Sequence, residues 1–399
     1  MRILVAWDDA DQADLISLYL GTEENEIKVC LASQEFTEQL VQGRWDVALI
    51  ALTFPKTPED GFATFQKLQE KLPGLPVVLG CRQTEMLNLP RFMTHGLRFY
   101  MIRDDNGDFI FLALTSLESA VGAARADEQK KLASYLRDEM DGVRRMQESI
   151  IPKGLVPPPG YAITARYEPA QVQVVGEMPV VMAGGDYYDL FLPDKDHLAL
   201  MVGDASGHGL KACMSIMAMH TLIRMFTGAR YRETAKFVGE INQRLCENSI
   251  VQSGGGFITL FYTAIDTAAH VMHWTTAGHP LALMQNLKTN EVVAIGTDAE
   301  AGLPLGIYPD VEYSSSSMGI PSGSRVLIYS DGLTDALPPQ GGPHSELAFG
   351  AQGVSKVMQA CRDRDIEYTL NQLFEATSKF TGGIGRHDDT SVVLLERFA

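Results

Sequence analysis

The sequence predicts a multidomain protein: a parallel α/β domain, then a long helix, then an α+β domain with mostly antiparallel sheets. Three observations predict this order. Apolar runs alternate with amphipathic segments in about the first 115 residues, a helical pattern without internal proline follows, and strand-like segments then succeed one another. Strands spaced by helices need crossovers and form parallel sheets, whereas strands in direct succession pair antiparallel.

The first region carries short apolar runs with the length and composition of buried strands, at 2–7, 26–32, 46–52, 76–81 and 97–102. Amphipathic segments separate the first four of these runs, at 13–21, 35–42 and 61–72. Because parallel strands need long crossover connections, these segments are predicted to be helices that cover both faces of one sheet.

A long helix is predicted from Leu112 to Ile151, and the proline-rich segment 151–160 ends it. Gly122 and Gly142 have low helix propensity and predict one or two breaks. Apolar residues recur along it at spacings of three and four, at Leu132, Leu136, Met140, Val143, Met146 and Ile150. This stripe either packs on the helix's own domain or pairs with a second copy of the chain, as in a homodimeric coiled coil or bundle.

The remaining region is predicted to be α+β. Strand-like segments occupy 161–169, 197–205, 256–266, 269–278, 324–332 and 390–397. Two helical stretches interrupt them, at 210–247 and 353–379. The predicted domain limits are therefore 1–115, 116–151 for the helical linker, and 152–399.

Composition limits the classes of function. The 399 residues are 45% hydrophobic and carry a formal net charge of −17, which argues against non-specific binding to nucleic acid. The five cysteines are scattered and form no CxxC pair, which is typical of a reducing compartment. The N-terminus does not resemble a signal peptide and no apolar stretch approaches the ~20 residues of a membrane span. We therefore expect a cytoplasmic protein that does not engage membranes.

Aspartates stand at four strand ends of the last region: Asp186, Asp204, Asp331 and Asp388. The first two lie in the motifs GGDYYD (184–189) and GDASGHG (203–209), which fall at the ends of neighbouring strands. A single Asp-Gly pair is most often a turn. Four acids at strand ends in one domain instead indicate a metal centre, because Mg²⁺ and Mn²⁺ take oxygen ligands. A water held between two such ions is acidified and can attack a phosphorus atom.

The segment from about Arg137 to the C-terminus resembles the SpoIIE-like branch of the type 2C metal-dependent serine/threonine phosphatases. The motifs occur in order as MQESIIPK, GGDYYD, GDASGHG, FITLFYTAID, TTAGHPLALM, GLPLGI, SDGLTDA and DDTS. The resemblance implies two packed β-sheets flanked by helices and two Mn²⁺ or Mg²⁺ ions. It also implies a ligand set of Asp186, Asp204, Asp331 and Asp388 with the backbone carbonyl of Ala205. The HDDTS segment also allows Asp389 as the last ligand, and we prefer Asp388, the first acid of the pair.

The first region resembles a response-regulator receiver domain, which has a doubly wound α/β sheet. Asp8 and Asp9 match its acidic pair, although an ungapped match puts Trp7 on the first acid. The other reactive positions differ: Ala51 stands at the phosphoacceptor, Cys81 at the hydroxyl residue and Arg103 at the lysine. Alanine has no oxygen to phosphorylate. We therefore expect a degenerate receiver that is regulated by an unidentified protein partner rather than by phosphoryl transfer.

The resemblance implies a protein serine/threonine phosphatase whose substrate is a phosphorylated anti-sigma-factor antagonist in a partner-switching pathway. The alternative is an adaptor that keeps the phosphatase fold but is catalytically weak or inactive. GGDYYD taken alone also fits an adenylate or diguanylate cyclase, but the phosphatase motifs that follow have no place in such an enzyme. His208 and His279 lie in glycine-containing motifs, SGHG and AGHP, and we expect them to be structural.

Overall fold

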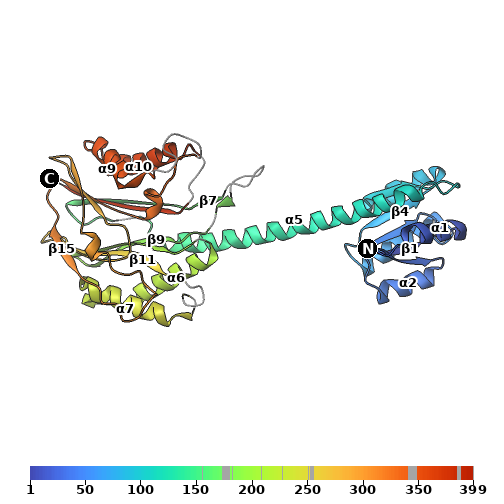
Figure 1. Ribbon diagram of the computed structural model, residues 1–399, viewed down its shortest axis with the longest axis horizontal. Coiled ribbons are helices and arrows are strands. Elements are labelled where there is room, and N and C mark those ends of the chain that lie inside the picture. Colours follow the sequence, from blue (N-terminus) through green and yellow to red (C-terminus); the bar gives the residue numbers. More distant parts are fainter. Residues whose placement is uncertain are drawn as a thin grey trace. The chain divides into compact units, whose positions relative to one another are not determined.

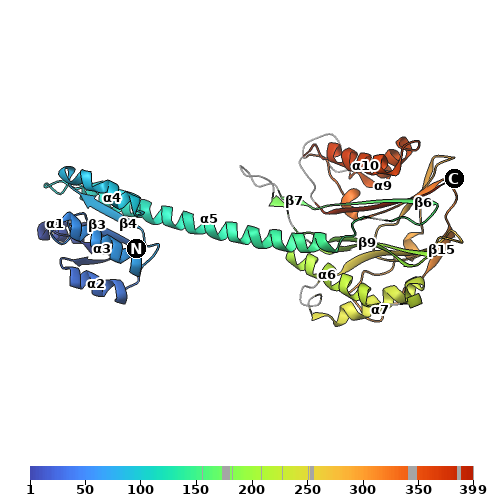
Figure 2. The same cartoon turned by 180° about the vertical axis from the view of Figure 1, so that it is seen from behind.

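The computed structural model describes residues 1–154, 156–172, 180–181, 183–207, 209–226, 228–249, 251, 256–339, 348–383 and 388–398. The chain divides into two compact units, Met1–Leu136 and Arg137–Ala399. Figure 1 labels the elements of both units, and Figure 2 shows them from behind. Each unit has its own hydrophobic core and is described by itself.

The first unit contains a five-stranded parallel sheet in the order β2-β1-β3-β4-β5, which confirms the predicted α/β fold. The strands are β1 (Arg2–Ala6), β2 (Glu26–Cys30), β3 (Val47–Ala51), β4 (Val77–Cys81) and β5 (Phe99–Ile102). The connections contain α1 (Ala10–Leu20), α2 (Ser33–Gln42), α3 (Pro58–Lys71), η1 (Gln83–Asn88) and α4 (Leu89–Thr94). The order reverses between β1 and β3, and sheets of this class bind ligands beyond the carboxyl ends of the strands at such a reversal.

Helix α5 (Ile110–Ile150) is continuous over 41 residues, so the prediction of a break at Gly122 or Gly142 was wrong. A glycine inside a helix costs about 1 kcal/mol relative to alanine but keeps its backbone N–H, so the ladder continues through it. Ala113 and Leu117 pack in the core of the first unit. Every residue from 128 to 139 is exposed, and Ile150 packs against the core of the second unit.

The second unit is built on two five-stranded antiparallel sheets, as expected. One has the order β15-β12-β11-β10-β9 and the other β14-β13-β16-β17-β6. The strands of the first are β9 (Asp186–Asp194), β10 (His197–Ala205), β11 (Ile258–Asp266), β12 (Val271–Ala277) and β15 (Ser316–Gly319). Those of the second are β6 (Tyr161–Glu168), β13 (Leu283–Asn286), β14 (Glu291–Ala294), β16 (Ser324–Tyr329) and β17 (Thr390–Arg397). A two-stranded pair, β7 (Gln171–Val172) and β8 (Val180–Val181), lies outside both sheets.

Three hydrophobic clusters make this unit a four-layer sandwich. The helices are α6 (Leu210–Met225), α7 (Thr234–Glu247), α9 (Gly350–Ala360) and α10 (Ile366–Phe380). The middle cluster joins the inner faces of the two sheets through residues such as Val202 and Val393. The outer clusters hold α6 and α7 on the first sheet and α9 and α10 on the second. Both views show these helix pairs on opposite sides of the sheets.

None of the helices in the described ranges combines the length and the apolar character that crossing a lipid bilayer requires.

Candidate metal centre

The ends of β9 and β10 bring two of the predicted acids together. Asp186 is the first residue of β9, and Asp204 is the residue before the last of β10. The two strands are antiparallel, and Asp186 and Asp204 are direct partners in their register. Asp186 is buried and Asp204 is half-buried.

The second sheet brings its acids to the same place. Asp331 begins the 3₁₀ helix η4 (Asp331–Leu333), which follows β16, and Asp388 stands two residues before β17. The hydroxyl of Ser330 donates a hydrogen bond of 2.6 Å to Asp186 Oδ2, which joins the two sheets at this end. The charges of Asp331 and Asp388 act on Asp204, so the four acids lie near one another at one end of the sandwich.

Gly184 and Gly185 allow this crowding because they have no side chains. A Cβ on Gly184 would overlap the Asp389 carboxylate, and a Cβ on Gly185 would overlap the carbonyl oxygen of Ala205. The Ala205 carbonyl, which is the predicted backbone ligand, therefore lies against the glycine segment that precedes Asp186. The glycines of GGDYYD are required here for close approach rather than for a turn with positive φ.

Asp388 and Asp389 occupy different environments. Asp389 is buried, and its Oδ1 and Oδ2 accept hydrogen bonds from the N–H groups of Ala170 and Gly185, at 2.8 and 2.7 Å. Asp388 is exposed, and its charge acts on Asp204 and Asp331. Asp388 Oδ1 accepts a hydrogen bond of 2.8 Å from the N–H of Asp389. Asp388 stays our candidate for the metal ligand because it is the exposed acid of the pair, whereas the buried Asp389 holds the backbone of Ala170 and Gly185.

The proximity of the acids raises their pKa values. Burial is the largest cause for each of the three acids below. Burial and the charges of Asp331 and Asp388 raise the pKa of Asp204 to about 8. Burial and Asp388 raise the pKa of Asp331 to about 6. The pKa of Asp186 is also well above its usual value, because it is buried beside Asp204. Carboxylates that disfavour each other's ionisation to this extent need either protons or cations nearby.

The donors present fit Mg²⁺ or Mn²⁺, because they are carboxylate and carbonyl oxygens. Within the described ranges, no three or more histidine, cysteine, aspartate or glutamate side chains are grouped so that they could hold a metal ion. Mg²⁺, however, is commonly held by only one or two carboxylates and keeps several of its waters.

His279 is buried and stays neutral. Burial lowers the pKa of its imidazole to about 3. Its Nδ1 lies 2.8 Å from the hydroxyl of Thr259, which contacts the carbonyl oxygen of Asp204 at 3.4 Å. This environment agrees with a structural role. His208 lies outside the described residues.

The amide of Gln147 donates to the carbonyl oxygen of Asp186 and accepts from the N–H of Gly184, at 3.0 and 2.9 Å. Gln147, Ser330 and the buried Asp389 were not predicted as residues that support the site. Gln147 lies in MQESIIPK and Ser330 in SDGLTDA, so both were inside quoted motifs. Their polar character alone gave no reason to place them beside Asp186, because α5 and β16 are distant from β9 in the sequence. Asp389 was considered only as an alternative ligand.

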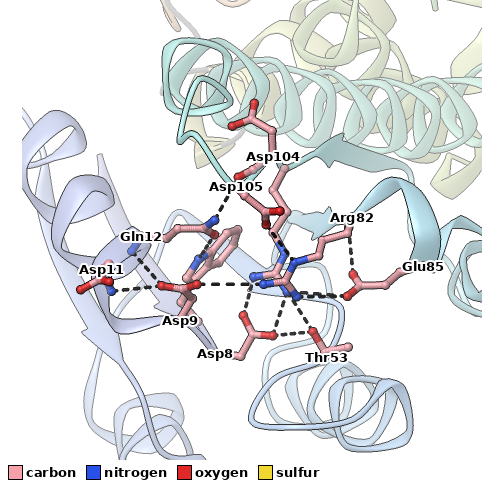
Figure 3. A network of polar contacts seen from close by, with 11 residues as sticks. Asp8, Asp9, Asp11, Gln12, Thr53, Arg82, Glu85, Asp104 and Asp105 are labelled. Atoms are coloured by element: carbon pink, nitrogen blue, oxygen red, sulfur yellow. Dashed lines mark hydrogen bonds and ion pairs between the residues drawn. The ribbon is translucent and has the colours of Figure 1, made fainter.

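In the first unit, an ion-pair network lies beyond the carboxyl ends of the strands (Figure 3). The guanidinium of Arg103 is fully buried and pairs with both carboxylate oxygens of Asp8. Thr53 donates its hydroxyl to Asp8 and accepts a hydrogen bond of 2.9 Å from Arg103. Burial alone would raise the pKa of Asp8, but the bonds from Arg103 and Thr53 outweigh it and hold the pKa below its usual value.

Arg82 extends this network toward the surface. Its guanidinium lies 3.3 Å from Glu85, 3.7 Å from Asp105 and 4.0 Å from Asp9. Ala51, at the position of a phosphoacceptor, is the last residue of β3 and is fully buried. This end of the sheet therefore carries the cationic side chains of Arg82 and Arg103, and an alanine stands at the position of the phosphoacceptor.

A sandwich of two antiparallel sheets, flanked by helix pairs and carrying acids at one end, is the fold of the type 2C phosphatases. The SiaA-PP2C domain of Pseudomonas aeruginosa shares it, with a TM-score of 0.52 and 18% identity over 69% of this chain and 100% of that chain. The family model of stage II sporulation protein E (SpoIIE) matches residues 194–398, more than half of the chain. The chain belongs to the SpoIIE family.

Two curated relatives come from Bacillus subtilis (strain 168). Phosphoserine phosphatase RsbU is 25% identical over 225 residues, which cover 55% of this chain and 61% of that protein. Phosphoserine phosphatase RsbP is 28% identical over 155 residues, which cover 38% of this chain and 36% of that protein. The matches thus span about a third to three-fifths of the length of these relatives.

Substituting Gly184 tests the packing of the site. In Gly184→Ala the new methyl group must displace the Asp389 carboxylate, so we expect weaker binding of Mn²⁺ and a loss of about 1–3 kcal/mol in the free energy of unfolding, typical of overpacking. Gly239→Ala is the control, because a Cβ there meets nothing within 4 Å and the residue lies inside α7. Denaturant titration and Mn²⁺ titration of both variants measure the difference. Equal stability and equal Mn²⁺ binding in both would contradict the close packing of Gly184 on Asp389.

Proposed function

We propose that the protein is a metal-dependent serine/threonine phosphatase. The observation that carries this proposal is the gathering of Asp186, Asp204, Asp331 and Asp388 from two sheets at one end of the sandwich. Membership of a family that includes proteins named phosphoserine phosphatases supports it.

In this proposal Asp186, Asp204, Asp331 and Asp388 hold two Mn²⁺ or Mg²⁺ ions, together with the carbonyl oxygen of Ala205. When bound, the ions supply an acidified water and offset charge on the phosphoryl oxygens. The protein's own part is to place the ligands. Ser330 orients the Asp186 carboxylate, and Asp389 fixes the Gly185 backbone beside it.

We further propose that the substrate is phosphoserine or phosphothreonine on an anti-sigma-factor antagonist, so that its dephosphorylation switches the partner of an anti-sigma factor. The names of RsbU and RsbP support phosphoserine as the substrate class. A Mn²⁺-dependent phosphate-release assay against phosphorylated antagonists tests it. Mn²⁺ binding without release from any phosphoprotein would favour the inactive adaptor instead.

Asp204→Asn and Asp331→Asn test the metal centre. Each removes one charged ligand, so we expect Mn²⁺-dependent hydrolysis to fall at least about 100-fold. Mn²⁺ should raise the melting temperature of the wild type, and this increase should be smaller or lost in both variants. Without metal, both variants should melt no lower than the wild type, because asparagine removes a carboxyl group whose ionisation is disfavoured in the folded state, as the raised pKa values of Asp204 and Asp331 indicate.

The control for these variants is Asp363→Asn, at a carboxylate whose side chain is 89% exposed. It should keep wild-type hydrolysis and the wild-type response to Mn²⁺. Full activity in both Asp204→Asn and Asp331→Asn would reject the proposed mechanism.

We infer that the first unit regulates the second without being phosphorylated itself. Ala51 cannot accept a phosphoryl group, and Arg103 already supplies the charge that neutralises Asp8. Acetyl phosphate and beryllofluoride should therefore leave the mass of the protein and its phosphatase rate unchanged. An acid-labile phosphate within residues 1–115, detected by intact mass and peptide mapping, would overturn this inference.

We also propose that α5 pairs with a second copy of the chain. Leu132 and Leu136 are 58% and 52% exposed, and their neighbours from 128 to 139 are exposed as well. Charged substitutions, Leu136→Glu with Val143→Glu, should lower the mass measured by light scattering and change the rate of phosphate release. The double substitution of exposed polar residues Gln129→Glu and Ser134→Glu controls for added charge. If the mass from light scattering and the rate of phosphate release are both unchanged in the Leu136/Val143 variant, α5 neither pairs with a second copy nor affects activity.

A further inference from the structure

Helix α6 exposes apolar side chains at the end of the second unit that carries the acids. Leu210 and Met214 lie one turn apart on this helix and are 56% and 40% exposed, and Lys211 beside them is exposed as well. The other side of the same turns is buried, because Ala212 and Ile216 pack in the core beneath the first sheet. We call the exposed residues Leu210, Lys211 and Met214 the α6 face.

The α6 face begins beside the proposed metal centre. The N–H of Gly209, which precedes the helix, donates a hydrogen bond of 2.9 Å to the carbonyl oxygen of Ala183, three residues before Asp186. Burial and the charge of Asp389 raise the pKa of the Cys213 thiol, which lies in the first turn of α6. The first turn therefore lies next to the segment that leads into the acids.

The composition of α6 differs from that of an ordinary surface helix. A surface helix carries charged and polar side chains toward solvent, and a helix that is apolar on all sides is usually covered. From 210 to 223, α6 contains one lysine and no arginine, aspartate or glutamate. Exposed methionines adapt their shape to a partner and are common on surfaces that bind other proteins. The α6 face therefore has the composition of a surface that a partner covers.

We propose that the α6 face is the docking surface for the protein part of the substrate, a folded phosphoprotein that presents apolar side chains beside its phosphoserine. The proposal rests on the function proposed above. In phosphoserine only the Cβ and Oγ atoms separate the phosphorus from the backbone. A phosphoryl group that reaches ions at this end of the sandwich therefore brings the surface of its own protein against the surrounding residues.

Charge complementarity supports this occupant. The chain has a formal net charge of −17, which opposes the approach of a negatively charged phosphoprotein. The first turn of α6 differs from this average, because it contains Lys211 and no acidic residue. The apolar side chains of Leu210 and Met214 add contacts that do not depend on charge.

Leu210→Gln combined with Met214→Gln tests the proposal in the full-length protein. Glutamine is a good helix former of similar length, so the change removes apolar contact and keeps the helix. Two Mn²⁺-dependent reactions are compared: hydrolysis of p-nitrophenyl phosphate, which needs only the metal centre, and phosphate release from a phosphorylated antagonist protein. The ratio of kcat/KM for the phosphoprotein to kcat/KM for p-nitrophenyl phosphate should fall at least about tenfold. The fall should come from a higher KM for the phosphoprotein, because contacts away from the reacting group are lost.

Met225→Gln is the matched control. Met225 is 64% exposed at the other end of the same helix, about 16 Å from Met214 at the rise of an α-helix. This variant makes the same chemical change and should keep the wild-type ratio of the two kcat/KM values.

Lys211→Glu tests the contribution of charge. An acid in the first turn should lower kcat/KM for the phosphoprotein, and by a larger factor at low ionic strength than at high, because salt screens exposed charges. Lys211→Arg keeps the positive charge and should behave like the wild type. An effect of Lys211→Glu that does not change with salt would contradict the role given to this charge.

The remaining outcomes separate the other occupants of the α6 face. An unchanged ratio in the Leu210/Met214 variant would overturn the proposal. If that variant also had a lower mass by light scattering, a second copy of the chain would be the occupant instead. Absence of Mn²⁺-dependent hydrolysis of p-nitrophenyl phosphate by the wild type would contradict the proposed function, on which docking depends.

Discussion

Repulsion between carboxylates at one end of the sandwich is the constraint on which the second unit depends. Asp186 and Asp204 come from one sheet, and Asp331 and Asp388 from the other. Burial, together with the charges of the neighbouring acids, raises the pKa values of Asp186, Asp204 and Asp331. Hydrophobic packing between the sheets holds the four strand ends in place despite this repulsion. The glycines, the Ser330 hydroxyl and the Gln147 amide then fix the backbone around Asp186. A stable interior therefore supports a locally unfavourable arrangement of charge, which is what a site for cations requires.

The first unit meets the same problem in the opposite way. Asp8 follows β1 and is largely buried, which by itself would raise its pKa. Hydrogen bonds from Arg103 and Thr53 outweigh burial and lower the pKa of Asp8. The arginine side chain is a permanent counter-ion that cannot dissociate as a metal can. The proposed metal centre would take its counter-ions from solution, whereas the first unit neutralises Asp8 with an arginine of the same chain. The acids of the second unit thus suit a catalytic metal centre, whereas the Asp8–Arg103 pair suits a structural role.

The sequence was informative where residues act locally. Strands 197–205 and 390–397 were predicted to the residue, because long apolar strands carry a clear pattern. Strands β13, β14 and β15 were missed, since four residues are too few to show a period. The predicted helix break was wrong because glycine propensity is small beside the packing of both ends of α5. The acids could be recognised by residue type, whereas the partners of Asp186 depend on contacts between distant segments.

The three tryptophans give the two units separate optical signals. Trp7 and Trp45 belong to the first unit, where Trp7 is fully buried, stacks on Phe109 and donates its indole N–H to Gln12. Trp274 belongs to the cluster between the sheets of the second unit, and its indole nitrogen has no hydrogen-bond partner among the residues that the structure describes. With Trp7 and Trp45 replaced by phenylalanine, the remaining emission would come from the interior of the sandwich alone. The wavelength of maximum emission from Trp274 would then report changes in the packing between the two sheets whose ends carry the acids.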